Sequence, residues 1–186
     1  MLLPEGWSDS LRPMCRTDLG QVSDLELQVS PTPWALGAFS DCLGTGYDNW
    51  VIEVAGRVNA FLVMAVSAGE AHLLNFAVRP VHQRQGMGSW LLHQAQQYAA
   101  QRGAVQILLE VRPSNRPALE LYTCAGFEVL SRRRNYYRGK APEDALVMCC
   151  GLSVEREDAA RDPVWCLRKI ERMLQYDEVH CPHPEG

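Results

Sequence analysis

The sequence predicts an α/β fold whose central sheet is mixed and mostly antiparallel, with helices on its flanks. Three strand-like runs, at residues 49–54, 58–66 and 71–78, follow one another with only short glycine-containing turns between them. After these runs the pattern alternates between helix and strand. Short turns produce antiparallel hairpins, whereas a helix between two strands permits a parallel pair. The domain is therefore expected to combine both kinds of strand pairing.

Two helices are expected ahead of these strands. Thr17 is placed as the N-cap of a helix that ends at Val29, with Asp18 in its first turn. The run Ser30-Pro31-Thr32-Pro33 stops that helix, because proline is not tolerated in a helix interior. A short second helix is predicted from Trp34 to Cys42.

The alternating part begins with a helix at Met87. Apolar residues recur there at helical spacing, and Gly103 ends the segment, since glycine commonly follows the last helical residue. Asn115 is predicted to cap the next helix. A strand, that helix and two further strands follow in order, at residues 105–111, 115–126, 127–134 and 144–150.

Residues 1–152 are predicted to form one domain and residues 153–186 a C-terminal extension. Asp162-Pro163 is typical of a helix start. An apolar stripe then predicts one amphipathic helix, with Val164, Leu167, Ile170 and Leu174 on one face. That helix packs on the domain or on a second subunit, and the sequence leaves both open. The terminal His180-Cys181-Pro182-His183 is interpreted as an exposed tail, so no metal is expected.

Composition and charge narrow the class of protein. Eighteen Lys and Arg residues against 22 Asp and Glu residues give a formal net charge of −4. This balance argues against a general nucleic-acid-coating protein, whose affinity rests on a basic surface. No apolar run approaches the roughly 20 residues that cross a bilayer, and residues 1–7 lack the features of an export signal. We therefore expect a cytoplasmic protein without membrane or direct nucleic-acid partners.

The most informative segment joins the third strand to the helix at Met87. Residues 75–89 read NFAVRPVHQRQGMGS. The first turn of a helix carries N–H groups without intrahelical acceptors and the positive end of the helix dipole. Gly86 and Gly88 let the backbone approach an anion closely, and Arg84 adds a positive charge, so the turn suits a pyrophosphate. A purely steric role for the two glycines is the alternative.

A second group of residues follows the strand at 105–111. Glu110 interrupts this apolar strand, where an ionised carboxylate costs free energy unless it has a partner or reaches a wet cleft. In a cleft it is a candidate base; the alternative is an ion pair with Arg112. Asn115 and Tyr122 lie two turns apart on the same helix face, so both can point into one groove. The alternatives are a simple cap for Asn115 and a core position for Tyr122.

Together these motifs resemble one family. Gln83 to Gly88 match the Q/R-x-x-G-x-G/A acetyl-CoA loop of the GCN5-related N-acetyltransferases (GNAT), and residues 115–127 match their N-x-x-A-x-x-L-Y-x-x-x-G-F block. Residues 110–115, 133–137 and 143–148 further resemble the RimI branch, the bacterial ribosomal-protein-alanine N-acetyltransferases. The resemblance implies the GNAT fold, in which a parallel strand pair is splayed at the acetyl-CoA site.

The resemblance also implies a reaction: transfer of acetyl from acetyl-CoA to the N-terminal α-amino group of a protein. The branch's target is the N-terminal alanine of a small-subunit ribosomal protein. By the same resemblance Glu110 is the general base and Tyr122 the general acid. The implied cofactor-binding residues are Phe76, Ala77, Val78, Arg84, Gln85, Gly86, Met87, Gly88, Ser89 and Asn115.

The sequence says less about the acceptor than about the cofactor. Residues 132–134 beside Tyr136 and Tyr137 invite an RNA-binding interpretation, but a solvated strand edge leading into a substrate loop fits the acidic chain better. We expect Tyr136, Tyr137 and Trp34 to contact the acceptor. The cofactor motifs do not select that acceptor. Acetylation of lysine side chains or of a small amine therefore stays open, as does a catalytically silent acetyl-CoA-binding module that regulates a partner.

Overall fold

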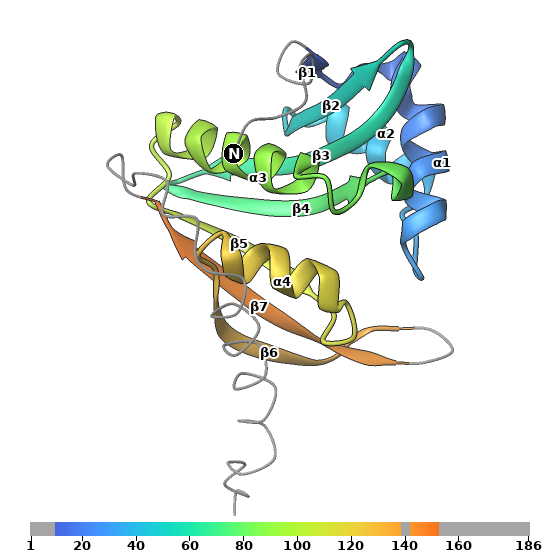
Figure 1. Cartoon of the computed structure of the whole chain (residues 1–186). Helices are drawn as coiled ribbons and strands as arrows, with labels where there is room; N and C mark the ends of the chain where they lie inside the picture. Colours follow the sequence, from blue (N-terminus) through green and yellow to red (C-terminus); the bar gives the residue numbers. More distant parts are fainter. Residues whose placement is uncertain (1–9, 139–141, 153–186) are drawn as a thin grey trace, which may run out of the picture. The chain divides into compact units, whose positions relative to one another are not determined.

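The computed structural model describes residues 10–138 and 142–152 (Figure 1). These residues divide into two compact units. The first holds residues 10–109 and 151–152, and the second holds residues 110–138 and 142–150. No helix of the described part of the chain combines the length and the apolar character that a membrane crossing needs. The predicted C-terminal helix and the terminal histidine–cysteine segment lie outside the described residues.

The first unit is built on a sheet with the strand order β1-β2-β3-β4-β5. The strands are β1 (Leu11–Pro13), β2 (Asp48–Val54), β3 (Arg57–Ser67), β4 (Glu70–Val78) and β5 (Gln106–Val111), whose last two residues belong to the second unit. Successive pairs from β1 to β4 are antiparallel. In contrast, β4 and β5 are parallel, with residues 70–73 paired to residues 106–109. The predicted mixed, mostly antiparallel sheet is therefore confirmed.

Two tight turns set the register of the antiparallel strands. Ala55 and Gly56, between β2 and β3, have φ values of 52° and 74°. Ala68 and Gly69, between β3 and β4, have φ values of 51° and 83°. Two consecutive left-handed residues form the type of turn whose twist matches that of the paired strands.

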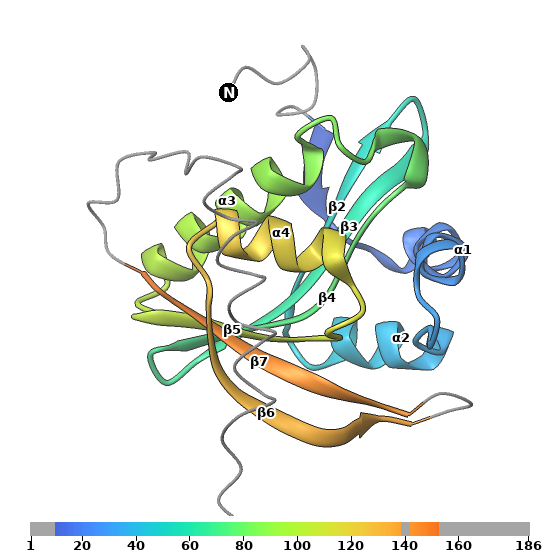
Figure 2. The ribbon, with the colours of Figure 1, turned by 60° about the horizontal axis from the view of Figure 1, so that its bottom comes forward.

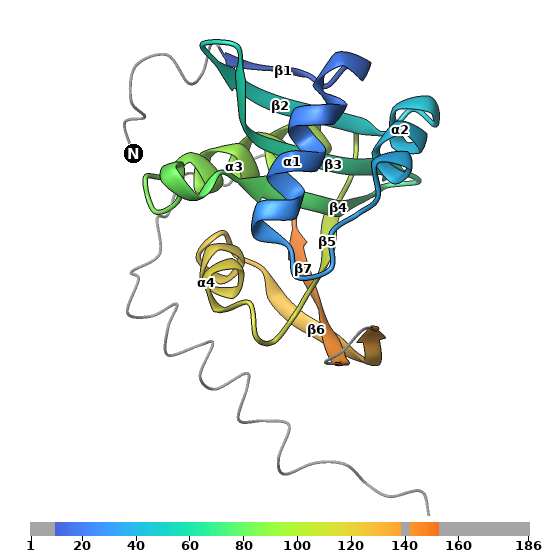
Figure 3. The ribbon, with the colours of Figure 1, turned by 90° about the vertical axis from the view of Figure 1, so that its right-hand side faces the viewer.

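Helices cover both faces of this sheet. α1 (Leu19–Val29) and α2 (Leu36–Gly44) pack on one face, and α3 (Met87–Gln101) packs on the other (Figures 2 and 3). A buried apolar cluster joins the sheet to α1 and α2, formed by Met14, Leu19, Val22, Leu25, Phe39, Cys42, Val51, Val58, Phe61, Val63 and Ala77. The buried side of α3 repeats at helical spacing, with Met87, Leu91, Leu92, Ala95 and Ala99. The sheet is therefore covered by apolar side chains on both faces.

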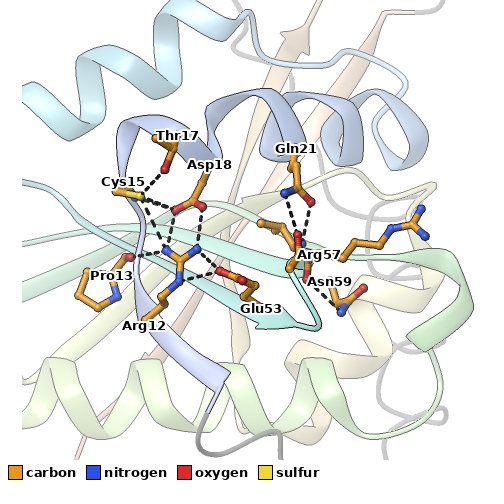
Figure 4. Close-up of polar contacts among 11 residues, drawn as sticks. Arg12, Pro13, Cys15, Thr17, Asp18, Gln21, Glu53, Arg57 and Asn59 are labelled. Carbon is orange, nitrogen blue, oxygen red and sulfur yellow. Dashed lines mark hydrogen bonds and ion pairs between the residues drawn. The ribbon is translucent and has the colours of Figure 1, made fainter.

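Charged side chains tie β1 to the start of α1 and to β2 (Figure 4). The Arg12 guanidinium donates to both carboxylate oxygens of Asp18, each at 2.7 Å. Its Nε also donates to the Glu53 carboxylate at 3.0 Å. Such two-pronged contacts between a guanidinium and a carboxylate are among the strongest hydrogen bonds in proteins. The short strand β1 is thus held by side chains as well as by its backbone.

The predicted N-cap of the first helix is wrong. We expected Thr17 to cap a helix that contains Asp18, whereas a 3-10 turn spans Arg16–Asp18 and α1 begins at Leu19. The reason is that the Asp18 carboxylate accepts the Cys15 N–H at 2.8 Å, in addition to its bonds from the arginine. Asp18 therefore closes the turn that leads into the helix.

The second unit contains α4 (Arg116–Cys124) beside the hairpin of β6 (Glu128–Tyr137) and β7 (Glu143–Gly151), whose last residue belongs to the first unit. The hairpin is antiparallel, and its register places Arg133 directly opposite Ala145. The register shifts between Arg133 and Tyr137. Most side chains of β6 are exposed. This unit carries the proposed catalytic residues.

The predicted helices and strands between residues 17 and 150 all occur, with ends that differ by a few residues. β6 continues to Tyr137 instead of ending at residue 134, and α2 begins at Leu36 instead of Trp34. The N-cap predicted at Asn115 is confirmed, because its side-chain oxygen accepts the Ala118 N–H at 3.3 Å. β1 was not predicted.

Candidate active site

The turn before α3 has the backbone geometry expected of an anion site. Gly86, the residue before the helix, is left-handed with a φ of 91°, a conformation that glycine adopts without a side-chain penalty. Arg84, two residues earlier, is also left-handed, with a φ of 60°, and its side chain is exposed. A positive charge therefore stands at the start of a helix of 15 residues. The first-turn N–H groups and the helix dipole favour an anion at this place.

Buried and local contacts hold this turn in the first unit. Arg79, at the end of β4, is only 6% exposed. Its guanidinium donates two hydrogen bonds to the Val58 carbonyl, at 3.2 and 2.7 Å. The Gln85 side chain donates to the Val81 carbonyl at 2.8 Å. The other predicted residues of the turn differ in exposure: buried Met87, half-buried Gly88 and exposed Ser89.

Residues 76–78 end β4 soon after a β-bulge. Leu74 is the additional residue of the bulge, at the point where the register of β3 and β4 shifts. A bulge bends its strand and takes one residue out of the ladder of hydrogen bonds. The Phe76 N–H donates to the neighbouring Asn75 side chain at 2.7 Å. Phe76 is half-buried, whereas Ala77 and Val78 are buried.

Glu110 lies near the end of β5 and forms an ion pair with Arg133 of β6. The Nη1 atom of Arg133 is 2.9 Å from Oε1 of Glu110. The Arg133 side chain is 56% exposed and the Glu110 side chain is 23% exposed, so the pair is open to solvent. The pairing with Arg112 that the sequence left open does not form, because Arg112 binds Glu143 instead.

Arg112 is the centre of a second and more buried contact. Its Nη1 atom is 3.2 Å from the Glu143 carboxylate, and its guanidinium carbon is 3.8 Å from the centre of the Tyr137 ring. Glu143 also accepts the Ser114 N–H at 2.7 Å and the Ser114 hydroxyl at 2.9 Å. Burial raises the pKa of the Glu143 carboxyl, but the bonds from Ser114 and Arg112 outweigh it, so this pKa lies below its ordinary value.

Tyr122 is buried on α4, with its ring centre 5.7 Å from that of Phe127. Burial, with a smaller contribution from Tyr137, raises the pKa of Tyr122 well above its ordinary value. Burial likewise raises the pKa of Tyr137 to about 12, against the opposing effect of Arg112. Both phenols therefore keep their protons at neutral pH.

The predicted acceptor-binding residues have different surroundings. Tyr136 is 45% exposed and its ring meets the Tyr137 ring edge to face, with centres 5.1 Å apart. Trp34, in the first unit, packs against the buried apolar cluster, with its ring centre 5.4 Å from that of Phe39. Its backbone N–H also donates to the buried Glu26 carboxylate at 3.1 Å. Trp34 therefore contributes to the core, whatever else it contacts.

The predicted site residues divide between the two units. The second unit holds Glu110, Asn115, Tyr122, Tyr136 and Tyr137. The first unit holds Trp34 and the remaining cofactor-binding residues, at 76–78 and 84–89. Sequence reasoning did not assign partners to Arg133 and Glu143, although both stand in the quoted motifs. Their partners lie 23 and 31 residues away along the chain, at Glu110 and Arg112, and depend on strand register that no local pattern encodes.

Comparison with known proteins identifies the family. Residues 17–127 match the Acetyltransferase (GNAT) family. The chain is 37% identical over 139 residues to the [ribosomal protein bS18]-alanine N-acetyltransferase of Escherichia coli strain K12, across 74% of this chain and 94% of that protein. It is 30% identical over 141 residues to the putative [ribosomal protein bS18]-alanine N-acetyltransferase of Bacillus subtilis strain 168, across 75% of this chain and 93% of that protein.

A solved structure agrees with these matches. The ribosomal-protein-S18-alanine N-acetyltransferase from Escherichia coli aligns with a TM-score of 0.72 and 35% identity, over 80% of this chain and 96% of that one. The predicted fold class is thereby confirmed, since the relative shares both the family and the fold. The chain belongs to the GNAT family and is an acetyltransferase.

Proposed function

We propose that this protein acetylates the N-terminal α-amino group of an acceptor protein, with the N-terminal alanine of a small-subunit ribosomal protein as the acceptor. The observation that carries the proposal is the 37% identity to the Escherichia coli alanine N-acetyltransferase, which extends over 94% of that protein. The residues of the motif resemblance, including Glu110 and Tyr122, support it. A ribosomal acceptor also implies a cytoplasmic enzyme.

The turn before α3 suits the diphosphate of acetyl-CoA, which supplies the acetyl group as a thioester. Left-handed Gly86 opens the backbone at the start of the helix, and exposed Arg84 adds a positive charge. The N–H groups of residues 87–89 belong to the first helical turn and lack intrahelical acceptors, as in any α-helix. Asn115 and residues 76–78 complete the proposed cofactor-binding set.

Glu110 is the proposed general base. An α-ammonium group must lose a proton before its nitrogen can attack, and its ordinary pKa of roughly 7.7–8.0 makes this easier than for lysine. The Glu110 carboxylate, directly or through one water, accepts that proton. Its side chain is 23% exposed, so a solvent-borne amine can reach it. The nitrogen then bonds to the acetyl carbon, and a backbone N–H of residues 76–78 stabilises the charge on the carbonyl oxygen.

Tyr122 is the proposed general acid. The carbon–sulfur bond breaks as the amide forms, and the sulfur leaves as a thiolate that requires a proton. A tyrosine phenol, with an ordinary pKa of about 10, holds its proton at neutral pH, and Tyr122 is the group that donates it to that sulfur in this scheme. The second proton that the attacking nitrogen loses as the amide forms returns to Tyr122, directly or through water. The products are an acetylated N-terminus, a free thiol and the proton held by Glu110, which passes to solvent, and the enzyme forms no covalent bond in this scheme.

A panel of acceptor peptides tests the proposal. Release of the CoA thiol is measured with acetyl-CoA and with peptides that begin with alanine, peptides that begin with other residues, and N-blocked peptides that contain lysine. Turnover with the alanine peptide well above the others is expected. Preference for the N-blocked lysine peptides contradicts the proposal, and binding of acetyl-CoA without turnover on any amine points to a silent module.

The variant Glu110→Gln tests the proposed base. Losing a general base lowers the rate by about 10²- to 10⁴-fold, so kcat should fall by that order while the KM for acetyl-CoA stays unchanged. Glu128→Gln serves as the control, because it neutralises an exposed carboxylate at the start of β6. If Glu110→Gln turns over at the unsubstituted rate, another group removes the proton.

A further inference from the structure

Two arginine–carboxylate pairs in the second unit differ in how firmly they are held. The Arg112 side chain is only 10% exposed, stacks on Tyr137 and binds Glu143, which Ser114 holds in turn. The Arg133 side chain is 56% exposed and is paired with Glu110. Solvent-exposed ion pairs contribute little stability, because water screens them and long side chains lose freedom when paired. Of these two pairs, the second is therefore the one in which another cation can replace the arginine at the carboxylate.

The position of Arg133 fits such an exchange. Directly opposite residues of an antiparallel pair share a face of the sheet, so Arg133 and Ala145 lie on the same face. Its guanidinium contacts the Glu110 carboxylate. Apart from that carboxylate, the Tyr136 ring lies 5.7 Å from the guanidinium carbon, and Tyr136 is itself exposed. Nothing in these contacts encloses the arginine.

We propose that Arg133 is the counter-ion of Glu110 in the resting enzyme and that the α-ammonium group of the acceptor displaces it. This inference rests on the proposed function, in which Glu110 receives a proton from that group. The acceptor arrives as a cation, and the guanidinium at Oε1 of Glu110 both repels it and occupies part of the carboxylate that it approaches. Arg133 thus occupies the carboxylate until the acceptor arrives and competes with the acceptor for it.

The competition has a specific signature. Removing the guanidinium frees the carboxylate, so a peptide with a free N-terminal amine should bind more tightly. The same peptide with an acetylated N-terminus carries no ammonium group and should bind as before. A general loss of structure would alter the binding of both peptides. Loss of a positive charge can by itself favour the cationic peptide, so a variant that removes the neighbouring charge of Arg132 is needed as well. The two comparisons together isolate the exchange at Glu110.

The experiment uses isothermal titration calorimetry on the full chain with CoA present, so that no acetyl transfer occurs. Arg133→Gln is expected to tighten binding of an alanine-starting peptide about two- to fivefold, the range that an exposed ion pair is worth. Binding of the N-acetylated peptide should stay the same. In turnover assays, the peptide KM should fall while kcat and the KM for acetyl-CoA are retained.

Arg132→Gln is the matched control. It removes the same charge from the neighbouring residue of β6, where the guanidinium is 2.8 Å from the carboxylate of Asp144 rather than from the proposed base. It should leave the binding of both peptides unchanged. The double variant with Glu110→Gln and Arg133→Gln should bind the alanine-starting peptide no more tightly than Glu110→Gln alone. The reason is that the carboxylate for which the two cations compete is gone.

Several results overturn the inference. Equal tightening of both peptides, unchanged binding of the free-amine peptide, or weaker binding of it each excludes displacement. Failure of the proposed function is distinguishable, because it appears as an unsubstituted enzyme that does not acetylate alanine-starting peptides. Failure of this inference appears as normal acetylation without the expected effect of Arg133→Gln.

Discussion

Tyr122 and Asp18 differ in how their surroundings set their protonation. Burial raises the pKa of Tyr122, because a charged phenolate is disfavoured away from water. Hydrogen bonds from Arg12 lower the pKa of Asp18 to about 2, although burial acts in the opposite direction. The first shift reflects a phenol enclosed by the fold, and the second reflects a carboxylate that stabilises the fold.

Replacing Asp18 with asparagine is expected to remove a pH-dependent part of the stability. A carboxyl whose pKa is lowered by folding stabilises the protein above its ordinary pKa, and this contribution is lost as the pH falls toward 2. The shift corresponds to about 2 kcal/mol at neutral pH. Urea unfolding should therefore show Asp18→Asn less stable than the unsubstituted protein near neutral pH, with a difference that shrinks in acid.

Asp41→Asn is the control for this measurement, since Asp41 is an exposed carboxylate on α2. Its stability should follow that of the unsubstituted protein at every pH. A constant difference between Asp18→Asn and the unsubstituted protein from neutral to acid pH would show that ionisation of Asp18 is not what stabilises the fold.

The candidate site shows what the sequence can and cannot predict about single residues. Glu110 stands out because a carboxylate is unexpected in an apolar strand. Its partner was not predictable, since Arg112 is the nearer arginine in the chain and yet binds Glu143. Alternation along β6 puts the neighbouring Arg132 and Arg133 on opposite faces, and only Arg133 meets Glu110, whereas Arg132 meets Asp144. The register of β6 and β7 is a property of the folded unit.

Among the elements, the turn into α3 gives a test of the cofactor site. Gly86→Ala is expected to raise the KM for acetyl-CoA and to lower the free energy of unfolding. The φ of 91° is left-handed, and a side chain in that region costs about 1–2 kcal/mol. If the turn relaxes to relieve this strain, its N–H groups no longer present the same geometry to a diphosphate. Steady-state kinetics with varied acetyl-CoA and urea unfolding measure the two effects.

Gly103→Ala separates strain from binding. Gly103 follows the other end of α3 with a φ of 82°, and an added Cβ there would meet nothing within 4 Å. This variant should lose comparable stability and keep the KM for acetyl-CoA. Equal effects of both variants on that KM would indicate that loss of helix stability, and not the shape of the turn, weakens cofactor binding.

The elements differ in how well the sequence predicts them. α3 begins at Met87 as predicted, because Gly86 precedes it and its apolar spacing is regular. β1 escaped prediction because three residues are too few to show alternation, and its pairing partner lies in β2, far along the chain. The start of α1 was misplaced because Arg12, outside the helix, draws Asp18 into the preceding turn. Local pattern predicts an element, and distant partners set its ends.

At the scale of the whole molecule, a chain that ends at residue 152 is expected to retain acetyltransferase activity. The match to the Escherichia coli relative spans 139 residues and 94% of that protein, whereas it covers 74% of this chain. The predicted domain, residues 1–152, contains every motif on which the proposed mechanism depends. The kcat and both KM values of the shortened chain should equal those of the full chain. A folded but inactive shortened chain would assign residues 153–186 a part in catalysis.

β1 limits how this sheet can grow. Of the described strands it stands at the outer edge of the first unit, it spans only three residues, and it ends in Pro13. Proline has no N–H to donate, and a short strand offers few groups to an incoming one. A strand from another polypeptide would find few backbone groups to pair with at this edge, so β1 disfavours polymerisation by strand addition there.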